Sequence, residues 1–306
     1  MRRKLVKQGY NALTVTLPAE WLRRFSLNAG DEVSIEERKG SLEVTPEKEK
    51  TVKKTELDIS DLNDTLVWTY TIAAYRKGSD EIVLKLKKEQ AALIQKVVDA
   101  LLGLAIVEMS ENSCRIKDIT GTTTDEKEFS NILRRIFFLL EGTAESVLEA
   151  IRKDDKRALN NAEYQDYNIN KFSNFCLRIL GKRYFENFDT ALTHYIISEL
   201  ENLGDEYARL AIDISSLKAN LKKSLSPELI NLLEDVNSLT PLFEKIYYKF
   251  DNKLVMQLIE KKNVINKKIS SLFLKSNSME TVFLFHLSKI VHLIINLAER
   301  QIMASI

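Results

Sequence analysis

The chain has few cysteines and no long run of uncharged apolar residues, so it lacks the features on which disulfide-stapled folds and membrane spans depend. Its 306 residues include two cysteines, Cys114 and Cys176, which are far apart and lack the spacing of a metal site. A structural disulfide is therefore not expected. The sequence contains no run of about 18 or more uncharged apolar residues, and its N-terminus lacks an apolar signal core. We expect a soluble cytoplasmic protein without membrane insertion.

Histidine and glycine are also scarce, which limits the chemistry that the chain can perform. Three histidines leave little capacity for general-base catalysis. The sequence contains no nucleophile elbow, no His-Glu-x-x-His pair, no Walker loop and no glycine-rich nucleotide fingerprint. We predict that the protein is not an enzyme. Because 44% of the residues are hydrophobic, the chain can form two or three domains with proper cores.

Neither sign of charge is in excess over the whole chain, so any affinity for nucleic acid must come from a local patch. The sequence has 45 Lys and Arg against 44 Asp and Glu. Residues 1–24 contain six basic residues and one acidic residue, Glu20. Such an arm is either a solvated surface or a DNA-binding patch. The candidate DNA-contact residues are Arg2, Arg3, Lys4, Lys7, Arg23 and Arg24.

A strand, a proline and a short basic helix follow one another within residues 13–24. Leu13, Val15 and Leu17 alternate with threonines, which predicts a strand with one apolar face. Pro18 suits the first turn of the helix that follows, because its missing N–H would be unpaired there. We expect this helix to direct Trp21, Leu22 and Phe25 inward and to leave Arg23 and Arg24 on the surface.

Turn residues at 27–32 and 38–41 separate two further predicted strands, one through Val33 and Ile35 and one at 42–44. The module of about 45 residues thus has four short strands and one small helix. It is too small to bury an adequate core alone, so we expect it to dimerise.

Residues 2–45 resemble the SpoVT/AbrB swapped-hairpin domain. The family's pattern of strand, proline, glutamate and paired arginines falls on Leu17, Pro18, Glu20, Arg23 and Arg24, and its turn falls on Leu27, Gly30, Asp31 and Val33. The resemblance implies that two chains interlace into one barrel that presents basic residues to double-stranded DNA. Residues 9–12 replace the family's Leu-Gly-Arg, so base contacts are not transferred to those positions.

A polar segment at 46–50 closes this module, and a small α/β unit is predicted at 52–120. We expect strands at 55–59, 81–86, 105–109 and 114–119 and helices at 61–76 and 88–102. Trp68, Tyr70 and Tyr75 are interpreted as the core-facing side of the first helix. In the absence of a phosphate-binding loop, we assign the unit a packing and spacing role.

From Asp125 to the end the chain is predicted to be nearly all helix. Asp125 and Glu128 form a capping-box start after residues 121–124, and breaks near 152–155, 181–189, 224–227, 250–253 and 276–278 give six helices. Asp155 and Asn170 recur 96 positions later as Asp251 and Asn266. We therefore predict two tandem three-helix bundles, 125–218 and 227–306.

Glu201 and Asp205 stand four residues apart in the third helix of the first bundle, with His194 and Ser198 on the same face. This spacing lets two carboxylates share a cation, although an acidic pair of this kind is most often a solvated face. Both interpretations stay open on spacing alone.

Residues 125–306 resemble the PhoU family, whose two three-helix bundles carry metal motifs. Glu201, Gly204 and Asp205 match that motif, and Asp166 and Asn170 fall near the acids of the family's second helix. The resemblance implies a divalent or ferric ion (Fe, Zn, Mn or Mg) in the first bundle. The second repeat departs from the pattern at Lys262, Asn263, Asn266, Ser288 and His292. His286 and His292 are interpreted as ordinary polar or core residues.

Together the two resemblances indicate an archaeal PhoU-like phosphate uptake regulator with an N-terminal SpoVT/AbrB domain. We predict three parts: a dimeric β-barrel domain (1–46), an α/β unit (52–120) and an all-α domain (125–306). The predicted function is transcriptional regulation of phosphate uptake and homeostasis. In the alternative, the bundle docks on a phosphate transporter ATPase, a sensor kinase or another phosphate-signalling protein, and the barrel mainly dimerises.

Overall fold

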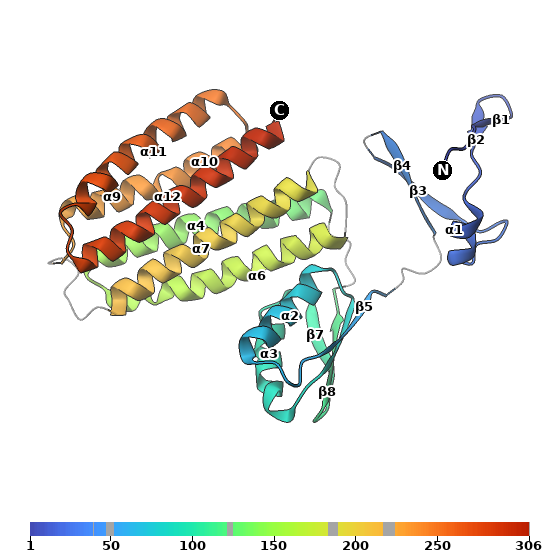
Figure 1. Cartoon of the computed structure of the whole chain (residues 1–306), viewed down its shortest axis with the longest axis horizontal. Coiled ribbons are helices and arrows are strands. Elements are labelled where there is room, and N and C mark those ends of the chain that lie inside the picture. The colour runs from blue at the N-terminus through green and yellow to red at the C-terminus, as the bar shows by residue number, and fades with distance from the viewer. Residues whose placement is uncertain (39, 47–51, 121–124, 183–188, 217–223, 306) are drawn as a thin grey trace. The chain divides into compact units, whose positions relative to one another are not determined.

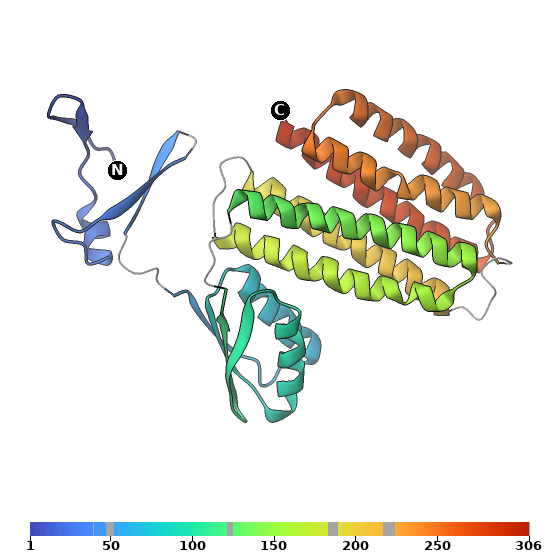
Figure 2. The same cartoon turned by 180° about the vertical axis from the view of Figure 1, so that it is seen from behind.

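The computed structural model describes residues 1–38, 40–46, 52–120, 125–182, 189–216 and 224–305 (Figures 1 and 2). Contacts divide the chain into two compact units, Met1–Val52 and Lys53–Ile306. Most of the predicted polar segment at 46–50 and all of residues 121–124 lie outside the described residues, as does the predicted repeat boundary at 218. The three-part domain division stays a prediction.

The N-terminal unit contains the four short strands and the one small helix that were predicted. The strand pairs are both antiparallel hairpins. The elements are β1 (Val6–Gln8), β2 (Ala12–Thr14), α1 (Ala19–Arg24), β3 (Val33–Arg38) and β4 (Ser41–Pro46).

The predicted strand through Leu17 is too long, because β2 ends at Thr14. Its partner β1 begins at Val6, which pairs with Thr14, so residues 15–17 have no ladder partner in the described chain. Pro18 is the N-cap of α1 with ψ 127° rather than a residue of its first turn. The extended conformation of the cap is the one that an N-cap residue normally adopts.

Apolar side chains of the N-terminal unit have no core to enter within one chain. No side chain that the structure describes in residues 1–46 is buried. Leu13 is 62% exposed and Ile35 is 60% exposed. The other exposed large apolar side chains on these strands and their flanks are Leu5, Val6, Val15 and Leu42. This is the surface expected of a module whose core forms only when a second chain supplies the other half.

The second unit begins with a four-stranded sheet in the order β5-β6-β8-β7. β5 and β6 are parallel, and the other two pairs are antiparallel. All six predicted strands and helices of this part are present, with ends within three residues of those predicted. The predicted helix 88–102 consists of a short 3₁₀ turn, η1, followed by α3, so the structure has seven elements here. They are β5 (Lys54–Asp58), α2 (Asp64–Arg76), β6 (Glu81–Lys85), η1 (Lys88–Gln90), α3 (Ala91–Asp99), β7 (Leu104–Met109) and β8 (Ser113–Asp118).

Helix α2 connects the two parallel strands and covers the sheet. Its N-cap Asn63 accepts a hydrogen bond from the Leu66 N–H at 2.9 Å. Tyr75 is fully buried and Trp68 packs at the edge of the core, as predicted. Tyr70 is 47% exposed, so its assignment to the core was wrong. It lies five residues from Tyr75, which places the two side chains on opposite sides of α2.

The remaining residues form an all-α bundle (Figure 2). The described helices end close to the predicted breaks. They are α4 (Glu126–Lys153), α5 (Lys156–Leu159), α6 (Asn161–Lys182), α7 (Thr190–Ser216), α9 (Pro227–Asn237), α10 (Leu239–Tyr248), α11 (Asn252–Phe273) and α12 (Ser278–Ser305).

One predicted helix, 227–250, is interrupted at Ser238. Pro241 lies three residues beyond the break and has no N–H to donate to the carbonyl of Asn237. The chain therefore restarts as α10 instead of continuing α9. A second short break, at Asn160, separates α5 from α6.

Two helix starts show the 96-residue spacing on which the predicted repeat rests. Asp155 caps α5, and its carboxylate accepts from the N–H groups of Arg157 and Ala158. Asp251, 96 residues later, caps α11 in the same way. Buried side chains from α4 to α12 form one continuous core, in which α7 packs against α12. The division into two tandem three-helix bundles stays a prediction.

Helix α12 is, among the described helices, the one long and apolar enough to cross a membrane by length and composition. Within the bundle, 61% of its most apolar window is buried. Its apolar composition is therefore accounted for by its place in the core of the bundle.

Candidate DNA interface and acidic helix face

The six predicted DNA-contact residues are all exposed in the N-terminal unit. Three precede β1, one lies in β1 and two end α1. They are Arg2, Arg3 and Lys4, then Lys7, then Arg23 and Arg24. Their cationic groups are available to phosphate oxygens, which fix a protein on DNA without reading its sequence.

One side of helix α1 is partly packed, which leaves Arg23 and Arg24 exposed on the other side. Trp21 and Leu22 are half-buried, and the rings of Trp21 and Phe25 lie 5.3 Å apart. Phe25 is less enclosed than predicted, with 38% of its surface exposed. Beyond the helix, the Asn28 N–H donates to the Asp31 carboxylate at 2.7 Å, and Gly30 adopts φ +97°. This turn needs glycine, because other residues rarely adopt that backbone conformation.

The four residues predicted to hold a metal ion come from the facing sides of α6 and α7. Gly204 allows the close approach, since a Cβ there would lie 3.0 Å from Ile169 Cδ1 and 3.2 Å from Asp166 Oδ1. The Asn170 amide donates to Asp166 Oδ2 at 3.0 Å. Glu201 and Asp205 flank Gly204 on α7. We call this set, Asp166, Asn170, Glu201 and Asp205, the acidic face.

Carboxylates on the acidic face repel one another. Burial, together with the charges of Asp205 and Glu201, raises the pKa of Asp166 to about 7. Two buried oxygens, Asp166 Oδ1 and Asn170 Oδ1, have no hydrogen-bond partner among the described residues. Because carboxylate and amide oxygens are the ligands that hard divalent cations prefer, this donor chemistry fits such an ion.

Side chains of the protein already neutralise part of the acidic face. The Arg76 Nη2 group of α2 donates to both carboxylate oxygens of Glu201 at 2.8 Å. Arg209 donates to Asp205 at 2.9 Å. Among the described residues, no group of three or more His, Cys, Asp or Glu side chains is arranged to hold a metal ion. An ion at the acidic face would be held by Asp166, Asn170 and Asp205, with Glu201 contributing if Arg76 moves away.

The second repeat presents no comparable acidic face. Ser288 and His292, which replace the acids of its third helix, are exposed on α12. On α11, a surface groove is lined by Asn263, Asn266, Lys267 and Ser270, which add a positive charge rather than a carboxylate. Their chemistry does not suit a hard cation.

The first site that the sequence analysis missed joins the sheet to α6. Arg178 is 3% exposed, donates to Asp118 Oδ2 at 2.7 Å and donates to the Tyr75 carbonyl at 3.0 Å. Lys182 pairs with both Asp80 and Asp118. Gly181 permits this contact, since a Cβ there would lie 2.5 Å from the Arg76 carbonyl oxygen. The partners are 60 to 105 residues apart, so no local pattern could have indicated them.

The second missed site is a buried polar cluster between α7 and α12. His286 Nδ1 lies 2.8 Å from Glu206, and its Nε2 lies 3.0 Å from Asp213. Lys289 Nζ lies 2.6 Å from the other Glu206 oxygen. Burial opposes a charge on His286, but the bonds to Glu206 and Asp213 outweigh it and raise the pKa of the imidazole. The general interpretation of His286 as a buried polar residue is correct, whereas its partners were not identified.

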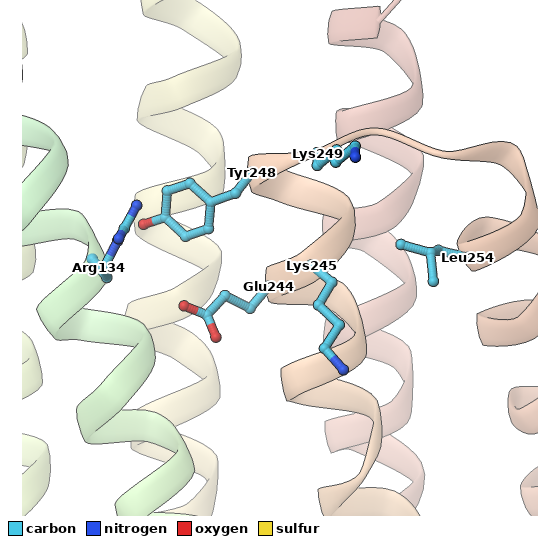
Figure 3. Close-up of a pocket in the computed structure, with 6 residues that line it drawn as sticks. All are labelled: Arg134, Glu244, Lys245, Tyr248, Lys249 and Leu254. Carbon is cyan, nitrogen blue, oxygen red and sulfur yellow. The ribbon is translucent and has the colours of Figure 1, made fainter.

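A surface pocket lies between α4 and α10 (Figure 3). The Arg134 guanidinium lies 4.7 Å from the centroid of the Tyr248 ring. Glu244, Lys245, Lys249 and Leu254 complete a lining that carries both signs of charge. This mixed lining selects no single class of ligand.

Comparisons with known proteins bear on both ends of the chain. Residues 6–51 match the family described as antidote-toxin recognition MazE, bacterial antitoxin. The crystal structure of the phosphate transport system regulatory protein PhoU from Streptococcus pneumoniae is similar, with TM-score 0.50 and 18% identity. That likeness covers 59% of this chain and 96% of that chain. No curated protein matches the chain.

The chain therefore has three parts: a small N-terminal β region, a middle α/β sheet and a C-terminal all-α bundle. It joins an N-terminal MazE/AbrB-type swapped-hairpin domain, of a type that binds DNA and dimerises, to a C-terminal helical region with the PhoU fold. Domains of these two types are typically non-catalytic regulators.

Proposed function

We propose that the protein is a dimeric DNA-binding transcriptional regulator of phosphate uptake and homeostasis. The observation that carries this proposal is the N-terminal unit, which exposes both six basic residues and the apolar side chains of its hairpins. Dimerisation would bury the apolar side chains and double the basic ones on one surface. The PhoU-like region then acts as the sensing or relay part.

Binding of the full chain to a duplex from its own upstream region tests this proposal. Fluorescence anisotropy at roughly 50 and 200 mM salt should show a steep loss of affinity with salt. We expect the double variant Arg23→Glu/Arg24→Glu to bind at least tenfold more weakly. The double variant Lys253→Glu/Lys275→Glu changes two exposed lysines of the second unit by the same total charge and should bind like the wild type.

The second candidate function is that of a protein-interaction regulator. It is favoured by the fold shared with a phosphate transport system regulatory protein. In this case the helical region docks on a phosphate transporter ATPase or a sensor kinase, and the N-terminal domain mainly dimerises. Affinity for the upstream duplex no better than for a random duplex, and unchanged by Arg23→Glu/Arg24→Glu, favours this function over the first.

We further propose that the acidic face binds a divalent or ferric ion, with Fe, Zn, Mn and Mg as the candidates. The unpaired oxygens of Asp166 and Asn170 support this proposal. Elemental analysis of protein purified without chelators should find metal that is lost in Asp205→Ala. Wild-type protein that is free of metal under these conditions would contradict it. An archaeal source remains a prediction from the domain combination.

A further inference from the structure

Arg76 of α2 donates hydrogen bonds to both carboxylate oxygens of Glu201 on the acidic face. Arg76 Nη2 lies 2.8 Å from each Glu201 oxygen, and Arg76 Nε donates to Asn174 Oδ1 at 2.6 Å. The two charged side chains are 31% and 21% exposed, so water screens the pair only in part. A planar guanidinium that is held at three points has a defined position.

The other members of the acidic face have no such partner. Asp205 pairs with Arg209 of its own helix, and that arginine is 54% exposed. Asp166 Oδ1 is buried without a partner among the described residues. Glu201 is thus the member of the face whose charge is balanced by another part of the fold, and the balancing group is the last residue of α2.

We propose that Arg76 is a tethered cation that competes with a divalent metal ion for Glu201. This inference rests on the proposed metal site of the acidic face. Both oxygens of Glu201 accept a hydrogen bond from the guanidinium, so a metal ion that binds this carboxylate must compete with the positive charge of Arg76 for its remaining lone pairs. Occupation of the face by a metal and docking of the α2 end then weaken each other.

If Arg76 were released from Glu201, the structure would change close to the point where the chain enters the second unit. Lys53 is the first residue of that unit. Its backbone N–H donates to Asp80 at 2.9 Å, and its ammonium donates to the Lys77 carbonyl, next to Arg76. Arg178 and its partner Asp118 hold the sheet on α6 independently of Glu201. The change is therefore expected at the end of α2, without separation of the sheet from the bundle.

Mn²⁺ titration of the full chain by calorimetry, with hydrogen exchange of α2 followed in parallel, tests the inference. Arg76→Ala should bind Mn²⁺ at least tenfold more tightly than the wild type, because the competitor is absent. Lys77→Ala removes the same charge from the next, exposed residue and should leave the affinity unchanged. In the wild type, Mn²⁺ should raise hydrogen exchange at the end of α2, whereas in Arg76→Ala it should not.

Each outcome decides between the two proposals. Equal Mn²⁺ affinities of the wild type and Arg76→Ala overturn the competition and leave the metal site standing, provided that Asp205→Ala abolishes binding. Absence of Mn²⁺ binding in both proteins overturns the competition and counts against the metal site as well. A tenfold gain in Lys77→Ala also overturns the specific role of Arg76, since general electrostatics would then explain the effect.

Discussion

Arg178 of α6 and Asp118 of β8 lie 2.7 Å apart, with the arginine almost completely buried. Together with the contact between Arg76 and Glu201, this pair attaches the α/β part to α6 and α7. The arginine belongs to the bundle in one pair and to the sheet unit in the other. The α/β part therefore packs directly on the helical region, which agrees with the packing role that the sequence suggested.

The close approach of α6 to α2 makes Gly181 sensitive to substitution. A Cβ at this position would lie 2.5 Å from the Arg76 carbonyl oxygen, so the backbone would have to shift. We expect Gly181→Ala to lower the free energy of unfolding by about 1–3 kcal/mol, as overpacking does. Urea denaturation measures the change.

Gly142 provides the matched control. It lies within α4, and a Cβ there meets no atom within 4 Å. Gly142→Ala should therefore raise the stability by roughly 0.5–1 kcal/mol, because alanine favours the helix. Equal effects of the two substitutions would contradict the close contact assigned to Gly181.

Dimerisation through the N-terminal unit predicts a specific sensitivity to charge. Leu13→Asp combined with Ile35→Asp places carboxylates on the exposed apolar strands and should convert the dimer to a monomer in sedimentation analysis. Leu274→Asp alters a side chain of the helical region that is 88% exposed and should leave the mass unchanged. A double variant that remains fully dimeric would place the dimer contact outside the N-terminal unit.

The cluster of His286, Glu206 and Asp213 makes stability depend on pH. The pKa of His286 is raised in the folded state, so its contribution is fully present below the ordinary value of about 6.5. The contribution is lost as the pH rises through the higher folded-state pKa. We expect the melting temperature of the wild type to fall across this range.

His286→Gln should flatten that pH dependence, because glutamine keeps a donor for Glu206 but does not titrate. His292→Gln, at an exposed position of α12, should retain the wild-type profile. Thermal melts between about pH 5.5 and 8 compare the three proteins. An unchanged profile in His286→Gln would mean that other groups set the dependence.

Local patterns in the sequence predicted most of the secondary structure. Caps such as Asp125, Asp155 and Asp251 mark helix starts through bonds to nearby N–H groups, so a few residues suffice to recognise them. The break at Ser238 was missed although Pro241 could have indicated it.

Long-range contacts could not be predicted in the same way. The spacing within α7 indicated Glu201 and Asp205, because helical periodicity fixes which residues share a face. Asp166 and Asn170 were indicated only by the resemblance to the PhoU family. The partner of Glu201 is 125 residues away in another element, and only the tertiary fold brings Arg76 to it. The bonds of His286 to α7 depend in the same way on the packing of α12.

Genome-wide mapping of DNA bound by the protein, in phosphate-rich and phosphate-poor medium, tests most directly the claim that it is a phosphate-responsive DNA-binding regulator. We predict discrete binding sites whose occupancy differs between the two conditions and is lost in Arg23→Glu/Arg24→Glu. A map without enrichment, or one that the double variant reproduces, would contradict the claim.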